Sequence, residues 1–336
     1  MRKFGTGLIW LCIVGAALLL GVLAAADLFF YAHRPVARQQ GQTLFTVSPG
    51  QGLADISRDL AAEGYIEHPV RFRILARILG WDKKIKAGEY VPPPESSPLA
   101  ILDQLVTGKV KQHRVTIPEG YALDQIADLL DGQGLVARDA FATAAHDSRL
   151  LAYHRLAADS FEGYLFPDTY YFTKPVRAEK VIETMLERFR QVFTPAMEKR
   201  ARALDMTVHQ VVTLASMIEK ETGAPFERPL ISSVFHNRLK KKMRLASDPT
   251  VIYGLEAFDG NLTKEHLKTW TPYNTYRIRG LPPGPIANPG LASLTAALYP
   301  ADTGYLYFVA KKDRTHYFSK NLKEHNRAVR KYQLRR

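Results

Sequence analysis

The feature that most constrains this chain is an almost wholly apolar run without a charged residue, over residues 8–26. An apolar run of about 20 residues is long enough to cross a bilayer as a helix. The run exceeds the core of roughly 7–15 residues in a secretory signal peptide, and it resumes after Asp27. We therefore expect an uncleaved transmembrane helix over 8–30. The alanines at 24–26 also fit a cleavage site, so a cleaved signal peptide is the alternative. Both interpretations export the rest of the chain.

The charge balance is the second constraint. Forty-six lysines and arginines against 33 aspartates and glutamates give a net charge of +13. Such a charge suits an anionic partner: nucleic acid, a lipid surface or an acidic polymer. The basic clusters are scattered and accompany no recognition helix or zinc finger, which argues against nucleic acid. Arg34 and Arg38 after the apolar run nearly balance Arg2 and Lys3 before it, so charge indicates its orientation only weakly.

No metal or cofactor is expected. The chain has one cysteine, and its ten histidines are scattered. It contains no HExxH, GxSxG, SxxK or phosphate-loop pattern, each of which is typical of a known chemistry. The sequence therefore implies neither a metal ion nor a nucleotide.

The exported part begins with a polar stretch over 31–43 that is typical of a linker, and residues 1–7 form a tail before the anchor. A weak internal repeat follows. Each copy predicts a short strand, a turn and a helix that ends at a glycine. The matching positions are Thr46, Gly50, Leu53, Ile56, Leu60, Gly64 and Ile66 in the first copy, and Thr116, Gly120, Leu123, Ile126, Leu130, Gly134 and Val136 in the second.

We expect an α+β fold class, with an N-terminal transmembrane helix, a small αβ module over 44–112 and a larger α+β domain over 113–336. The segments PGQGLADI (49–56) and KAGEY (86–90) resemble the LysM-like module of a bacterial wall enzyme family. A spacer domain without a ligand is the alternative.

A helix predicted over 208–222 carries the main chemical candidate. Thr207 with Gln210 fits a capping box, and Gly223 fits a C-terminal stop. At 100° per residue, Glu219 falls inside the apolar face of this helix. Burial and the negative end of the helix dipole both favour the uncharged form of a carboxyl group in such a place, as a general acid requires.

One alternative accompanies this interpretation. The pattern also fits a structural Glu219 that pairs with an arginine such as Arg228 or Arg238. Lys220 and Glu221 fall outside the apolar face, and we expect Glu221 and Glu227 to be surface residues or structural partners.

The long motifs around this helix occur in an ordered set. They are EGYLFPDTY (162–170), LASMIEKET (214–222), VFHNRL (234–239), MRLASDPTVIYG (243–254), YNTY (273–276), GLPPGPIANPG (280–290) and YLYFVA (305–310). With them the chain closely resembles the endolytic murein transglycosylase (YceG-like) family over nearly its whole length.

The resemblance implies a lytic transglycosylase in the inner membrane, with its catalytic domain on the periplasmic face. Such an enzyme cuts the β-1,4 bond between N-acetylmuramic acid and N-acetylglucosamine inside nascent peptidoglycan strands. It leaves 1,6-anhydro-muramic ends and so terminates elongation. Glu219 is implied as the acid and then the base. Penicillin-binding proteins of the wall synthesis machinery are plausible partners. A hydrolytic muramidase, with a second carboxylate such as Asp248 or Glu227, and a non-catalytic peptidoglycan-binding scaffold are the rivals.

Sugar binding requires flat apolar faces and fixed polar groups near the acid. The candidates for substrate contact are Asp248, Thr250, Tyr253, Tyr273, Asn274 and Tyr276. Arg228, Asn237 and Arg238 are candidates for orienting Glu219 or binding stem-peptide carboxylates. For all of them the alternative is a role in turns, core or ion pairs, and Arg238 is an alternative partner of Glu221 or Glu227.

Overall fold

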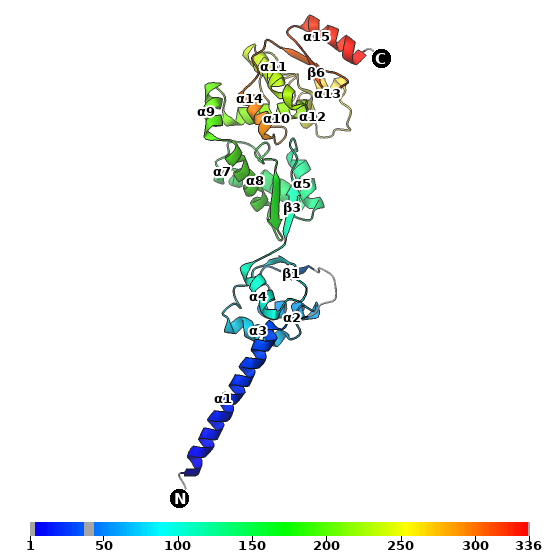
Figure 1. The fold of residues 1–336 in the computed structure, drawn as a ribbon. Coiled ribbons are helices and arrows are strands. Elements are labelled where there is room, and N and C mark those ends of the chain that lie inside the picture. Colours follow the sequence, from blue (N-terminus) through cyan, green and yellow to red (C-terminus); the bar gives the residue numbers. More distant parts are fainter. Residues whose placement is uncertain (1–3, 37–43, 335–336) are drawn as a thin grey trace. The chain divides into compact units, whose positions relative to one another are not determined.

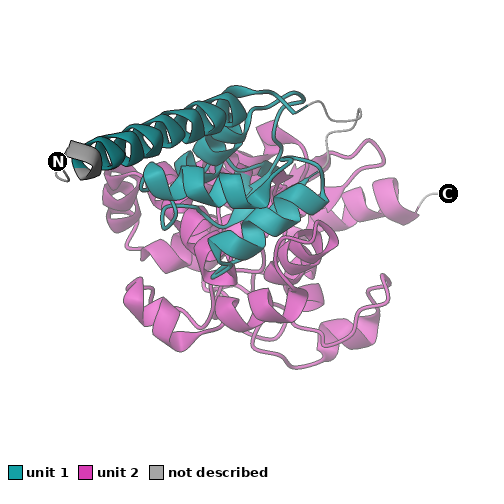
Figure 2. Cartoon of the chain, turned by 90° about the horizontal axis from the view of Figure 1, so that it is seen from below, with its two compact units in different colours: residues 1–113, 171–175 teal, residues 114–170, 176–336 magenta. Residues whose placement is uncertain are grey.

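The computed structural model describes residues 4–36 and 44–334, and mixes helices with short strands. Arg2, Lys3 and the linker residues 37–43 predicted above lie outside the described residues. The chain divides into two compact units, Met1–His113 with Tyr171–Pro175, and Arg114–Tyr170 with Val176–Arg336 (Figure 2). The expected mixture of helix and sheet behind an apolar N-terminal helix is confirmed, whereas the LysM-like identity of the small module stays a prediction.

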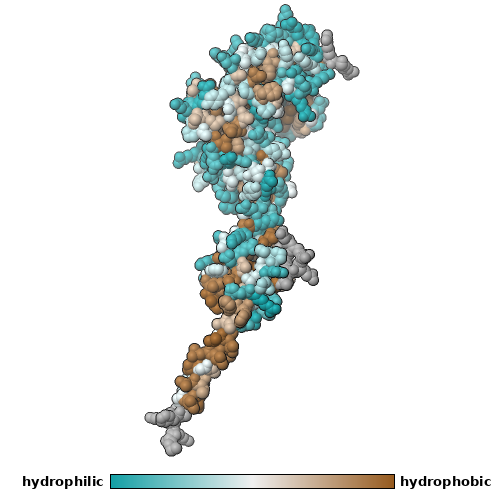
Figure 3. All heavy atoms as spheres, in the orientation of Figure 1, coloured by the Kyte–Doolittle hydropathy of each residue, from teal (hydrophilic) through white to brown (hydrophobic). Residues whose placement is uncertain are grey.

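Helix α1 (Phe4–His33) contains the predicted span and continues three residues into the predicted linker (Figure 1). The extension is stabilised by packing, because Tyr31 and Ala32 are buried and the Tyr31 hydroxyl donates to the carbonyl of His68. Large apolar side chains stay exposed along the rest of the helix, as the brown surface of Figure 3 shows. By length and composition, α1 is a candidate membrane anchor.

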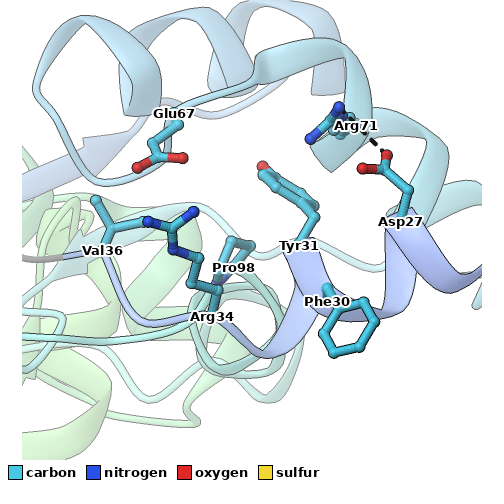
Figure 4. Close-up of a pocket in the computed structure, with 8 residues that line it drawn as sticks. All are labelled: Asp27, Phe30, Tyr31, Arg34, Val36, Glu67, Arg71 and Pro98. Atoms are coloured by element: carbon cyan, nitrogen blue, oxygen red, sulfur yellow. Dashed lines mark ion pairs between the residues drawn. The ribbon is translucent and has the colours of Figure 1, made fainter.

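The first unit combines helices with a two-stranded sheet. Strand β1 (Phe45–Val47) pairs antiparallel with β2 (Gly88–Tyr90), and Phe45 lies opposite Tyr90. Helices α2 (Leu53–Ala62), α3 (Pro69–Ile78) and α4 (Pro98–Thr107) complete the unit. The C-terminal end of α1 borders a cavity of about 110 Å³, where Arg71 pairs with Asp27 at 3.2 Å (Figure 4).

The internal repeat is present in the backbone. In the second copy β3 (Gln112–Thr116) leads to α5 (Leu123–Gly132) and α6 (Arg138–Ala145), as β1 leads to α2 and α3. The turn glycines Gly50 and Gly120 both adopt left-handed backbone angles, φ 79° and 76°, which glycine adopts without steric cost.

The second unit is mainly helical. Helix α10 (Val208–Glu221) is its central element and packs against α11 (Arg228–Lys240) and α14 (Leu291–Leu298). A hairpin of β5 (Tyr307–Ala310) and β6 (His316–Ser319) is covered by α15 (Leu322–Val329). Its remaining elements are α7 (Ser148–Tyr153), α8 (Ala178–Val192), α9 (Pro195–Ala203), a 3-10 turn (Pro225–Glu227), α12 (Asp248–Tyr253), α13 (Lys264–Lys268) and a π-helical turn (Arg330–Leu334). Strand β4 (Thr169–Thr173), which is divided between the two units, pairs with β3.

The predicted start of α10 agrees with the structure, whereas the predicted glycine stop at its end does not. The capping box is confirmed, because the backbone N–H of Gln210 donates to Thr207 Oγ1 at 3.2 Å and the Gln210 side chain accepts from the Thr207 N–H at 2.9 Å. The glycine stop is wrong. Thr222 ends the helix in an extended conformation, and its hydroxyl accepts the N–H of Ala224. Gly223 therefore needs no left-handed turn.

Candidate active site

Glu219 lies near the end of α10 with its side chain only 6% exposed, so its predicted burial is confirmed. Both carboxylate oxygens are occupied. Oε1 accepts from Nη2 of Arg228 at 3.0 Å, and Oε2 accepts from the backbone N–H of Gly290 at 3.0 Å. Arg228 is itself buried and donates through Nε to Ser293 Oγ. The structure thus contains the Glu219–Arg228 pair that the sequence offered as its structural alternative.

A second carboxylate joins this pair. Glu119 lies in the turn before Gly120, and its Oε2 is 3.9 Å from Nη2 of Arg228. Burial, and then the charge of Glu219, raise the pKa of Glu119 against the lowering effect of Arg228. A Cβ at Gly290 would overlap the Glu119 carboxylate as it lies here, so a side chain at this position would require Glu119 to move. Sequence reasoning missed Glu119; the repeat offered a signal, because the first copy has Pro49 at this place.

Glu221 occupies a different environment at the last position of α10. Its Oε1 accepts a hydrogen bond from the hydroxyl of Ser247. Burial, helped by the charge of Asp248, raises the pKa of Glu221 to about 7, although the Ser247 hydrogen bond and the charge of Arg238 act in the opposite direction. A carboxyl group with this pKa carries a proton over much of the neutral range.

Glu221 also borders a cavity of about 430 Å³. Three substrate-contact candidates from the sequence, Arg238, Asp248 and Tyr276, line it as well. The Tyr276 hydroxyl donates to Asp248 Oδ1 at 2.6 Å. Arg238 donates to the carbonyls of Leu306 and Leu245 at 2.7 and 2.6 Å, which fixes its guanidinium group. The chain therefore gathers a proton-bearing acid, a cation and an aromatic face around one cavity.

The side chains of three other candidates form hydrogen bonds to backbone carbonyls of the protein itself. The Asn237 amide donates to the carbonyls of Thr303 and Tyr305. Thr250 is buried and donates to the Ser247 carbonyl, and the buried Asn274 donates to the Thr269 carbonyl at 2.6 Å. These bonds correspond to the turn and core roles that the sequence left open.

Tyr253 and Tyr273 gather around another buried acid, Glu162. Their ring centroids are 4.8 Å apart, and the Tyr253 hydroxyl donates to Glu162. Burial raises the pKa of Glu162 to about 7 despite this bond and that from the Leu123 N–H. Tyr273 and Glu162 line a separate cavity of about 310 Å³. The structure thus divides the predicted sugar contacts between two places.

Glu227 is 2% exposed and is held by three donors. It accepts from the backbone N–H and the ring Nδ1 of His316, both at 2.7 Å, and from the hydroxyl of Thr222 at 3.2 Å. The structural role expected for Glu227 is therefore present. Within residues 4–36 and 44–334, no group of three or more His, Cys, Asp or Glu side chains is arranged to hold a metal ion.

The raised pKa of Glu221 predicts how pH affects stability. A raised native pKa means that folding favours the protonated form, so this stability is complete below about pH 4.5 and is lost as the pH rises through about 7. Glutamine at 221 keeps an uncharged acceptor for Ser247. E221Q should therefore match wild type below about pH 4.5 and exceed it above pH 7, by up to about 3 kcal/mol. Urea denaturation at several pH values measures this; a constant difference would contradict the assignment.

Comparison with known proteins shows that the chain is similar to members of one family over residues of both units. Residues 45–331 match the model of the YceG-like family. An endolytic murein transglycosylase of Bacillus subtilis is 32% identical over 315 residues, which cover 89% of this chain and 87% of that protein. One of Streptococcus pneumoniae serotype 2 is 27% identical, over 94% of this chain and 64% of that protein. The crystal structure of a putative YceG-like protein from Listeria monocytogenes is 35% identical, with a TM-score of 0.60 over 85% of this chain and 98% of that one.

Proposed function

The chain belongs to the YceG-like family, and on this premise we propose that it cleaves peptidoglycan strands internally from a membrane anchor. Its relatives named endolytic murein transglycosylase indicate a peptidoglycan lytic transglycosylase, which is a lyase. The apolar helix α1 supports a membrane anchor, and we place the catalytic unit on the outer face of the cytoplasmic membrane because the proposed substrate lies there. The substrate is the nascent glycan strand, and the synthetic penicillin-binding proteins are the proposed partners.

The observation that carries the catalytic assignment is the environment of Glu221. This carboxyl group is half-buried, has a pKa of about 7 and borders the cavity lined by Arg238, Asp248 and Tyr276. Glu219, the acid predicted from sequence, already accepts hydrogen bonds at both oxygens, from Arg228 and Gly290. We therefore assign the proton to Glu221, keep Glu219 as the rival acid, and assign the Glu219–Arg228 pair to holding the end of α10.

The proposed reaction needs one proton donor and an internal nucleophile. Glu221 gives its proton to the glycosidic oxygen as the C1–O4 bond breaks. The acetamido group of the substrate stabilises the positive charge at C1. The C6 hydroxyl then attacks C1 and gives its proton to a base, which forms the 1,6-anhydro ring without a water molecule. Asp248 and Tyr276 are proposed to contact sugar hydroxyls, and Arg238 a stem-peptide carboxylate.

Product analysis tests this function. Purified protein is incubated with uncrosslinked glycan strands, and the ends are identified by mass spectrometry after complete digestion. We expect new anhydro-muramic ends, each lighter by one water than a hydrolysed end. Hydrated ends alone would favour the muramidase, for which Asp248 beside Glu221 is the available second carboxylate. Binding without new ends would favour the non-catalytic scaffold.

A further inference from the structure

The Glu221 cavity contains a histidine that the proposed reaction has not yet used. His316, the first residue of β6, lines this cavity together with Glu221, and its side chain is 11% exposed. Its ring packs edge-on against Phe308, with centroids 5.4 Å apart. The hairpin thus fixes an imidazole at the wall of the cavity that holds the proposed acid.

The hydrogen bonds around His316 indicate its tautomer. Ring Nδ1 lies 2.7 Å from the carboxylate of Glu227, which also accepts from the His316 N–H and from Thr222. A carboxylate that serves as acceptor to its other neighbours requires a proton on Nδ1. Neutral His316 therefore keeps its lone pair on Nε2. No protein group among the described residues occupies Nε2 through a hydrogen bond found in the structure.

We propose that His316 is a catalytic base that accepts the proton of the muramic C6 hydroxyl. The inference rests on the proposed transglycosylase function. Glu221 first protonates the departing O4 as the C1–O4 bond breaks; O6 then attacks the C1 cation, the O6–C1 bond forms and Nε2 takes the O6 proton. The step leaves an imidazolium and a Glu221 carboxylate. Transfer of one proton from His316 to Glu221 through solvent restores both groups.

The charged groups around the cavity are consistent with Glu221 as the acid and His316 as the base. The titratable and charged groups that share the cavity are Glu221, Arg238, Asp248, Tyr276, Tyr307 and His325, and Glu227 lies behind the imidazole. The Glu227 carboxylate stabilises the imidazolium formed when His316 accepts a proton, as a buried acid does behind a catalytic histidine. Arg238 is fixed by two carbonyls, so it stays in place during the reaction.

The test removes the imidazole side chain of His316 by mutation and then supplies free imidazole in solution. We expect H316A to form anhydro ends about 100- to 1,000-fold more slowly than wild type, and added imidazole to restore much of that rate. H146A, at an exposed histidine of the same unit, is the matched control. H316A that is folded by circular dichroism and forms anhydro ends within about threefold of the wild-type rate would overturn the proposal. The proposal would also be overturned if H316A formed anhydro ends slowly and added imidazole did not restore the rate.

A second variant covers the case in which H316A does not fold. E227Q removes the carboxylate that orients Nδ1, so we expect slower anhydro formation and a larger share of hydrated ends, because O6 is less activated against water. E227Q with the wild-type rate and product ratio would overturn the proposal. Failure of the function itself looks different: wild-type protein would then form no anhydro ends.

Discussion

Replacement of Glu221 by glutamine is expected to lower the rate of glycan cleavage by about 100- to 10,000-fold, the usual contribution of a positioned general acid. Glutamine has nearly the same shape and still accepts from Ser247, but it has no proton to give to the glycosidic oxygen. The effect should fall on turnover, with strand binding largely retained. Release of shortened strands under single-turnover conditions, with binding measured separately, gives both quantities.

E219Q is the matched comparison for E221Q, since it makes the same change two residues earlier on the same helix. We expect E219Q to lose stability through the weakened bond to Arg228, and to retain much more turnover per folded molecule than E221Q. The opposite order, an inactive E219Q beside an active E221Q, would return the acid role to Glu219.

Replacement of Arg228 by methionine should destabilise the protein by about 3–5 kcal/mol. Arg228 is the cation shared by Glu219 and Glu119, and its side chain is 9% exposed. Methionine fills similar space but leaves the Glu219 carboxylate buried without a counter-charge. Urea denaturation measures the loss, and R228M combined with E219Q should recover part of it.

An exposed arginine provides the control for R228M. Arg202 pairs with Glu198 at 3.8 Å on the surface of α9, where an ion pair contributes less than about 1 kcal/mol. R202M should therefore change stability little. Equal effects of R202M and R228M would contradict the view that the buried cluster holds the end of α10.

Local patterns in the sequence were sufficient for the features that depend on neighbouring residues. The apolar run predicted α1, the capping box placed the start of α10, and the glycines of the repeat marked the two similar turns. The helical periodicity also placed Glu219 correctly on the buried face of α10. In each case the physical cause lies within one or two turns of chain, so the sequence pattern contains it.

The chemistry of Glu221 could not be predicted in the same way. Helical periodicity put it outside the apolar face, but the helix ends at this residue and its environment is built by Ser247 and Asp248, which follow more than 20 residues later. His316 and Glu119 likewise join their clusters from about 90 to 110 residues away in sequence. Such contacts depend on tertiary packing, which a helical pattern does not contain.

The central claim is that Glu221 carries the catalytic proton at neutral pH. The most direct measurement is infrared spectroscopy of the protonated carboxyl band as a function of pH, taken as the difference between wild type and E221Q. We expect a carboxyl band in this difference spectrum that fades as the pH rises through about 7. A difference spectrum without a protonated carboxyl band near neutral pH, or one whose band has already disappeared by about pH 5, would contradict it.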